Sequence, residues 1–442
     1  MYRPLILTAI ISVAVASSAA QASADWVSAV LDHPNLRVQN SSIEKQKWKI
    51  LELEAEQGFD FDIKSSAHLP IAEHFDSSFS RVATYDPYLD LVFSASHTLY
   101  DFGESDSLID AERTLQTRAR LAFANAFEQQ THALFSLVLQ HQKAKTTVVI
   151  IDTAQANIAL VKKDLVKRFE AGLGTITDIR RTQLSQIDLE TQIVQLFNKM
   201  DEIEHMVNSD YGLTVADLVN DWHSIEPQLS RVSYVPGQAL RTSAISQDLQ
   251  TSLRYQRNSI DAQKKPKLII DVNTTLYDVT RSLGNYRVAG EFRLTFPAFD
   301  SGYRSAKMAS ITHAISAEQQ ALAKVIQQKN LDLKTSERQI EDLELREQEG
   351  TKKHNNLVLQ LKNMKLSLGK TANDHASLAN MYTQIASAEI NLIGIASDME
   401  QLTLDHVLLS EQIIQQFNVS YNQLPWINLI TSRLRSIGFL GP

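Results

Sequence analysis

The sequence contains no cysteine among its 442 residues. It can therefore form no disulfide, no thiolate metal site and no cysteine nucleophile, and it has no N-terminal cysteine that could carry a lipid anchor. Glycine and proline are scarce, at 14 and 10 residues, which favours helix. The formal net charge of −8 comes from interspersed charges of both signs, which argues against a nucleic-acid partner.

Patterns typical of catalysis are also missing. The 12 histidines are scattered, and neither an H-E-x-x-H spacing nor a glycine-rich phosphate loop occurs. Asp60 and Asp62 resemble a carboxylate pair, but on a strand both face one side beside Lys64, which is typical of a solvated surface. We therefore expect no enzyme activity, no cofactor and no metal site.

Residues 1–24 have the pattern of a secretory signal peptide. Arg3 precedes an apolar run from Pro4 to Ala16, and small residues end at Ala24. The run is too short to span a bilayer, although a short N-terminal anchor is the alternative, and cleavage after Ala20 fits equally well. The mature chain is predicted to leave the cytoplasm.

A strand followed by a very long helix occurs twice. Alternating residues around Phe93 predict the first strand, and 104–171 contain neither glycine nor proline, which predicts one helix of about 100 Å. Gly103 and Gly172 bracket this helix 69 residues apart (172 − 103), and Gly302 and Gly369 bracket the second 67 apart (369 − 302). Two copies of one spacing indicate an internal repeat.

The predicted chain organisation follows this repeat. A first repeat covers 25–208, an irregular segment 209–247, a second repeat 248–420 and a tail 421–442. Within these segments we expect a helix from about Ser41 to Gln57 and a last long helix from Ala372 to Phe417.

Four strands are predicted, in two hairpins, each with one apolar and one polar face. Four such strands cannot close a barrel, and helices of about 100 Å cannot fold back as a compact cover. Because single-chain membrane barrels need at least about eight strands, three chains would be required, giving twelve. The residues predicted to face outward from this barrel are Phe59, Phe61, Ile63, Leu89, Leu91, Phe93, Leu268, Ile270, Val272, Val288, Phe292 and Leu294.

Three motifs resemble the TolC family of outer-membrane efflux and type I secretion ducts. They are Leu99-Tyr100-Asp101-Phe102-Gly103, the stretch from Arg168 to Ile179, and Phe296-Pro297-Ala298-Phe299-Asp300-Ser301-Gly302. The resemblance covers essentially the whole mature chain. It implies a mainly α chain with four transmembrane strands, assembled as a homotrimer with a twelve-stranded barrel in the outer membrane and a twelve-helix periplasmic tunnel. It also implies export of drugs or proteins together with a periplasmic adaptor and an inner-membrane pump.

The resemblance assigns roles to individual residues. Two interhelical turns would receive adaptor hairpins, one at Gly172 and Leu173, the other at Leu368, Gly369 and Lys370. The periplasmic gate candidates are Asp178, Asp374 and His375. Family members often place lumen carboxylates six and nine residues after the second glycine, where this chain has His375 and Leu378, so an acidic ring at that level departs from the family pattern.

A periplasmic coiled-coil adaptor or structural protein is the alternative. It would account for the long helices and the repeat. It would not account for four strands that each carry an apolar face.

Overall fold

The computed structural model describes residues 25–68, 88–229, 240–281, 283–367, 374–417 and 419. The predicted signal peptide, residues 1–24, and the tail beyond residue 420 lie outside this part of the chain. The chain divides into two compact units: unit 1 comprises 1–39, 123–241 and 326–442, and unit 2 comprises 40–122 and 242–325. Helices α3 (Glu104–Glu170) and α7 (Tyr303–Ser367) supply residues to both units.

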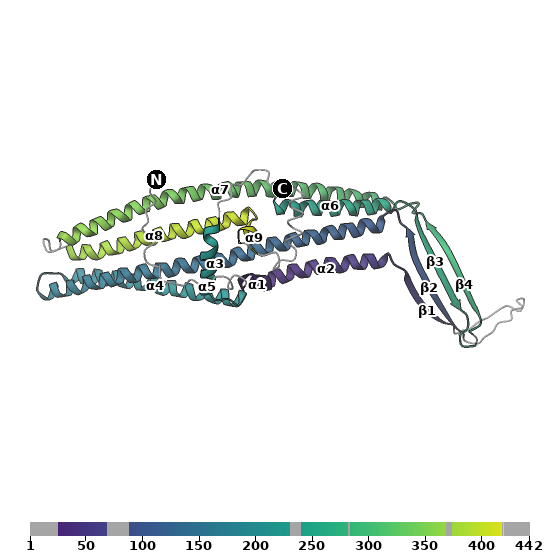
Figure 1. Cartoon of the computed structure of the whole chain (residues 1–442), viewed down its shortest axis with the longest axis horizontal. Coiled ribbons are helices and arrows are strands. Elements are labelled where there is room, and N and C mark those ends of the chain that lie inside the picture. The colour runs from purple at the N-terminus through teal and green to yellow at the C-terminus, as the bar shows by residue number, and fades with distance from the viewer. Residues whose placement is uncertain are drawn as a thin grey trace, which may run out of the picture. The chain divides into compact units, whose positions relative to one another are not determined.

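Unit 2 contains the only sheet in the described chain. Its strands are β1 (Asp60–His68), β2 (Tyr88–Tyr100), β3 (Lys267–Leu276) and β4 (Tyr286–Thr295). All neighbouring strands are antiparallel, in the order β1-β2-β3-β4, and lie side by side in Figure 1. The two predicted hairpins are therefore confirmed, and β2 and β3 join them into one sheet.

The strand-to-helix connections show the internal repeat in atomic detail. Phe102 and Gly103 have φ of 58° and 81°, and Ser301 and Gly302 have φ of 51° and 83°. In both connections one aspartate caps the following helix: Asp101 accepts the N–H groups of Gly103 and Ser105, and Asp300 accepts those of Gly302 and Arg304. Each strand therefore ends, and each long helix begins, through the same turn.

Unit 1 is helical in its described part. It contains α1 (Asp25–Asp32), α4 (Ile176–Tyr211), α5 (Val215–Ile225), the 3₁₀ turn η2 (Glu226–Gln228), α8 (Asp374–Leu409) and α9 (Ile413–Gln416). Helix α2 (Pro34–Glu56) begins in unit 1, and α6 (Arg241–Ala262) begins there with its first residue. Every helix in the described part of the chain is too short or too polar to cross a lipid bilayer.

The core of unit 1 comes from stripes spaced three or four residues apart. On α3, Ile151 and Ile158 are fully buried, and they pack in one cluster with Leu189 of α4 and Leu378 of α8. Gly350 lies inside α7 without ending the helix, and its lack of a side chain lets Leu392 of α8 pack closely against it. A Cβ at this position would lie 2.8 Å from Leu392 Cδ2 of α8.

Two sequence predictions about helices are wrong. The expected start near Ser41 is too late, because Pro34 stands at the first turn of α2, where its missing N–H costs nothing. The expected last helix also does not run unbroken to Phe417. It ends at Leu409, and Glu411 adopts a left-handed φ of 58° before α9 begins.

Candidate functional site

The strand register gathers apolar side chains on one face of the sheet. Phe93 pairs with Ile63 on β1, and Ile270 pairs with Phe292 on β4. Because directly paired residues of antiparallel strands point to the same side, this pairing extends one face across all four strands. Eleven residues predicted to face outward lie in strands on this face, and Phe59 lies one residue before β1.

This apolar face is open to solvent in the single chain. Phe61, Ile63 and Phe292 are 73%, 70% and 71% exposed. Exposed apolar patches of this kind mark surfaces that contact lipid or another protein. The face therefore requires a cover that the described part of the chain does not supply.

The opposite face of the sheet is polar. Asp271 of β3 accepts a hydrogen bond from Arg293 of β4, and on β1 Lys64 lies 3.5 Å from the Asp62 carboxylate. Asp271 is only 7% exposed, because the neighbouring strands flank it. The two faces of the sheet thus differ in polarity, as do the two faces of strands that form a water-filled barrel.

The sheet also has two unpaired edges. Within the described sheet, β1 and β4 each pair on one side only. An even number of antiparallel strands makes β4 antiparallel to β1, so β1 of a second copy could pair with β4 of the first in the same pattern.

The first interhelical turn ends α3 at Gly172. The Leu173 N–H donates to Arg168 O (2.8 Å) and the Gly172 N–H to Phe169 O (2.9 Å), which is the Schellman pattern. Gly172 has a φ of +75°, where a side chain is strained. Leu173, one residue beyond, is 64% exposed, so the turn presents an apolar side chain to solvent.

Asp178, predicted as a gate residue, takes part in a helix cap. Thr175 is the N-cap of α4; its hydroxyl accepts the Asp178 N–H and donates to the Asp178 carboxylate at 2.6 Å. Thr214 and Asp217 repeat this arrangement at the start of α5. Asp178 thus has a structural role in this chain, and its role in a gate stays a prediction.

The second interhelical turn cannot be described in the same way. Leu368, Gly369 and Lys370 lie outside the described residues. Asp374 and His375 belong to the first turn of α8, where the structure describes the backbone alone. Their docking and gating roles stay predictions.

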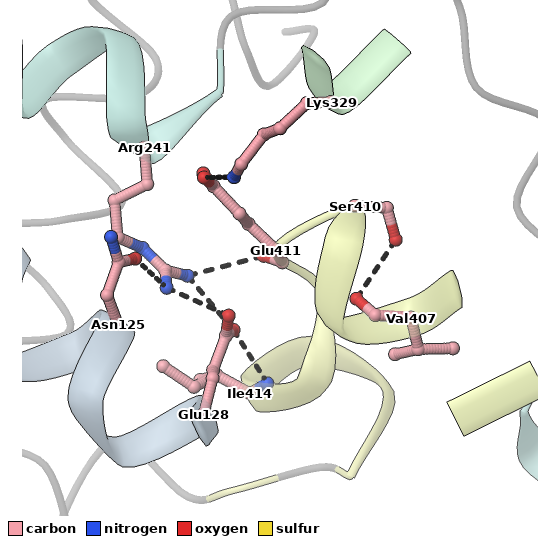
Figure 2. A network of polar contacts seen from close by, with 8 residues as sticks. All are labelled: Asn125, Glu128, Arg241, Lys329, Val407, Ser410, Glu411 and Ile414. Atoms are coloured by element: carbon pink, nitrogen blue, oxygen red, sulfur yellow. Dashed lines mark hydrogen bonds and ion pairs between the residues drawn. The ribbon is translucent and has the colours of Figure 1, made fainter. Parts of the chain in front are cut away.

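Sequence reasoning missed a buried polar cluster in unit 1 (Figure 2). Arg241 donates to both Glu128 oxygens, at 3.0 and 3.1 Å, and also to Asn125 Oδ1 and Glu411 O. Burial opposes the charge of Arg241, but the Glu128 carboxylate outweighs this effect and raises the pKa of the guanidinium.

The cluster fixes the break between α8 and α9. Glu128 Oε1 accepts the Ile414 N–H at 3.2 Å, so a carboxylate of α3 caps α9, whose own N-cap residue makes no side-chain bond. Lys329 of α7 pairs with the Glu411 carboxylate (Figure 2). No sequence signal marks this site, because Glu128 and Arg241 stand 113 residues apart and Glu411 has neither glycine nor proline beside it.

Comparison with known proteins identifies the fold. No family model matches the chain, and no curated protein matches it in sequence. Among solved structures, the outer membrane protein VceC from Vibrio cholerae matches 87% of this chain and 95% of its own at TM-score 0.73 and 13% identity. The Campylobacter jejuni outer membrane channel CmeC matches 94% and 89% at TM-score 0.73 and 10% identity. The outer-membrane channel OprN matches 88% and 90% at TM-score 0.72 and 13% identity.

The chain therefore has the fold of an outer-membrane channel subunit. The predicted resemblance to the TolC family is confirmed for this fold, with its long helices and four-stranded antiparallel sheet.

Proposed function

We propose that the chain is one of three identical subunits of an exit duct in the bacterial outer membrane. The duct passes cargo from an inner-membrane pump, recruited through a periplasmic adaptor, to the outside of the cell. The three sheets together form a twelve-stranded barrel, and the long helices form the periplasmic tunnel. The fold shared with CmeC and OprN, both described as outer membrane channels, supports this proposal.

The observation that carries the proposal is the two-faced, open-edged sheet. Its apolar face is exposed and its other face holds Asp271, Arg293 and Lys64. A bilayer tolerates strands only when every edge is paired, which closure into a barrel achieves. Three copies satisfy both requirements, because lipid covers the apolar face and each β4 edge pairs with the β1 edge of its neighbour.

The number of chains in the assembly is tested by measuring its mass. The mature protein, extracted from membranes in mild detergent, is expected to have the mass of three chains by native mass spectrometry, and to aggregate when detergent is removed. A monomer that stays in solution without detergent would favour the alternative, a periplasmic coiled-coil adaptor.

The docking role of the first turn is tested separately with Gly172→Trp. No atom lies within 4 Å of a Cβ at Gly172, so the substitution costs only the left-handed backbone strain, about 1–2 kcal/mol. Trimer assembly should be unaffected, because the sheet belongs to unit 2 and this turn to unit 1. Export should fail, because the bulky side chain prevents the adaptor from covering Leu173.

Gly212→Trp is the matched control. Gly212 ends α4 with a φ of +67°, and a Cβ at this position would also have no atom within 4 Å, so the strain is the same at a different helix end. Export that is normal in both variants would rule out the docking role. Loss of trimers in Gly172→Trp alone would show that the glycine is structural.

A further inference from the structure

The two free edges of the sheet are offset along the strands. The register within one chain leads from Asp60 of β1 through Ser96 and Asp271 to Glu291 of β4, so these four residues share one level. β4 continues beyond this level to Thr295, which is four residues further (295 − 291). An edge-to-edge contact between two copies can therefore be level or staggered, and the stagger decides which side chains meet.

A stagger of four residues pairs the whole of β1. It places Asp60 of one copy opposite Thr295 of the next and His68 opposite Arg287, so all 9 residues of β1 face a residue of β4. Without a stagger, β1 would find partners on β4 only as far as Ser65. The stagger must also be an even number of residues, because an odd one would place apolar side chains beside polar ones on both faces.

The same stagger gives a normal strand tilt. Four residues at each of three contacts shift the ladder by about 12 residues per circuit, or ~40 Å, across twelve strands that span ~58 Å. The strands then tilt by about 35°, within the range of about 35–45° for outer-membrane barrels. A stagger of two residues gives about 19°, far below this range, and a stagger of six gives about 46°, just above it.

The charges on the two edges agree with a stagger of four. On the polar face it places Lys64 of one copy opposite Glu291 of the next, and Asp62 opposite Arg293. Directly paired side chains of opposite charge attract each other across two strands, whereas like charges at such positions repel. Both charged pairs of this register are therefore attractive.

The other even staggers bring like charges together. A stagger of two residues places Asp62 opposite Glu291, and a stagger of six places Lys64 opposite Arg293. A level contact places Asp60 opposite Glu291. Strand length, tilt and charge thus independently favour the same register.

The four charged side chains are open for contact with a neighbour. Those of Asp62, Lys64 and Arg293 are 56%, 69% and 54% exposed, and Glu291 is also exposed. Asp271, which has a strand on each side, is only 7% exposed. Arg293 already donates to Asp271 within the chain, and its guanidinium has further N–H groups for a second carboxylate.

We propose that neighbouring subunits join through a β1–β4 ladder with a stagger of four residues, held in register by Lys64–Glu291 and Asp62–Arg293 ion pairs. The inference rests on the proposed trimeric barrel and adds which residues of two copies meet. Because the stagger determines the tilt and diameter of a barrel, these two pairs also determine the width of the duct.

Cysteine pairs at Ser66 test the register. Staggers of two, four and six residues place Ser66 opposite Arg287, Ala289 and Glu291, respectively. After oxidation in outer membranes, Ser66→Cys with Ala289→Cys should give at least about threefold more covalent trimer than Ser66→Cys with Arg287→Cys or Glu291→Cys. The reason is that diagonal neighbours, with Cα atoms about 7–8 Å apart, form disulfides less readily than directly opposed residues.

The outcomes of this scan separate the register from the trimer. A maximum at Arg287→Cys or Glu291→Cys would overturn the proposed register and leave barrel closure intact. The absence of cross-links from all three combinations would contradict the trimeric barrel itself, and the register with it.

Charge reversal tests the ion pairs. Lys64→Glu should lower the temperature at which the trimer dissociates in detergent, measured by native mass spectrometry after heating, because two carboxylates then face each other. Adding Glu291→Lys restores an opposite pair and should recover most of the loss. Asn273→Lys adds the same kind of charge on the inner strand β3 and should not. Equal stability of Lys64→Glu with and without Glu291→Lys would contradict the pairing, and if Lys64→Glu forms no trimer, recovery of trimers by Glu291→Lys is the readout.

Discussion

The buried Arg241–Glu128 pair yields the sharpest stability prediction. The two side chains are 4% and 2% exposed, so solvent cannot replace a missing partner. Arg241→Met leaves the Glu128 carboxylate with the Ile414 N–H as its remaining described donor. Removing one partner of a buried ion pair costs about 3–5 kcal/mol. We expect that loss in the free energy of unfolding of unit 1.

Glu128→Leu should lower the free energy of unfolding by a similar amount, because it leaves the Arg241 guanidinium without its charged partner and removes the cap of α9. The double variant should be much less harmful than the sum of the two. It leaves neither charge of the pair, and its main remaining cost is the unpaired Ile414 N–H, about 1–3 kcal/mol. The pair should therefore show a coupling energy of at least about 3 kcal/mol in a double-mutant cycle.

The assay is urea unfolding in detergent followed by circular dichroism at 222 nm, because the described part of unit 1 is helical. Lys143→Met is the control, since Lys143 and Asp398 form an exposed pair at 2.9 Å that should contribute no more than about 1 kcal/mol. The reasoning fails if Arg241→Met costs no more than Lys143→Met, or if the two single losses add in the double variant.

Three further predictions concern the sheet and the helix ends. Phe93→Arg should cost about 2–4 kcal/mol in folding into lipid vesicles, whereas Ser94→Arg, on the opposite face, should cost little; equal costs would show that the assigned faces are wrong. Burial opposes the ionisation of Asp101, but hydrogen bonds from Ser105 and Gly103 outweigh it and lower its pKa. Its ionised form therefore adds stability above its unfolded pKa of about 3.9, and this is lost as the pH falls through the folded value. The protection of the Gly103 and Ser105 amides against hydrogen exchange, relative to an unstructured peptide at the same pH, should fall in that acidic range, and Asp101→Asn should remove this pH dependence of the protection. Thr175→Ala should destabilise the start of α4 by about 1 kcal/mol, detected as faster exchange of the Asp178 amide; an unchanged rate would contradict the capping role.

Local sequence patterns were sufficient to predict the strands and long helices. Alternation around Phe93 and Ile270 predicted two strands that pair in the structure, and the residues between Gly103 and Gly172 predicted α3 to within one residue at its end. These patterns succeed because a strand with one polar face and a helix with a regular stripe repeat the same local chemistry many times.

The helix ends were harder to predict. Pro34 was interpreted as part of a lead-in, although proline is compatible with a first helical turn. Glu411 ends α8 without a glycine because distant residues hold it there: Arg241 binds its carbonyl and Lys329 its carboxylate. Tertiary contacts, rather than local preference, determine this break.

The candidate sites likewise divide into those that a local sequence pattern predicts and those that only tertiary packing creates. The apolar face of the sheet could be predicted from alternation, and the Gly172 turn from its glycine. The Arg241 cluster joins α6, α3 and the segment after α8, and only the packing of these elements brings Arg241, Glu128 and Glu411 together. A single sequence contains no periodic signal for such a site.

Barrel closure by three chains is the central claim, and the absence of cysteine makes it directly measurable. Asp62→Cys on the polar face of β1 is combined in turn with Arg287→Cys, Ala289→Cys or Glu291→Cys on the polar face of β4. After oxidation in outer membranes, at least one double variant should give a covalent ladder that ends at three chains, because β1 of one copy pairs with β4 of the next. Each single-cysteine variant should remain a monomer on denaturing gels. Monomers from all three double variants, or a ladder that extends beyond three chains, would contradict the account.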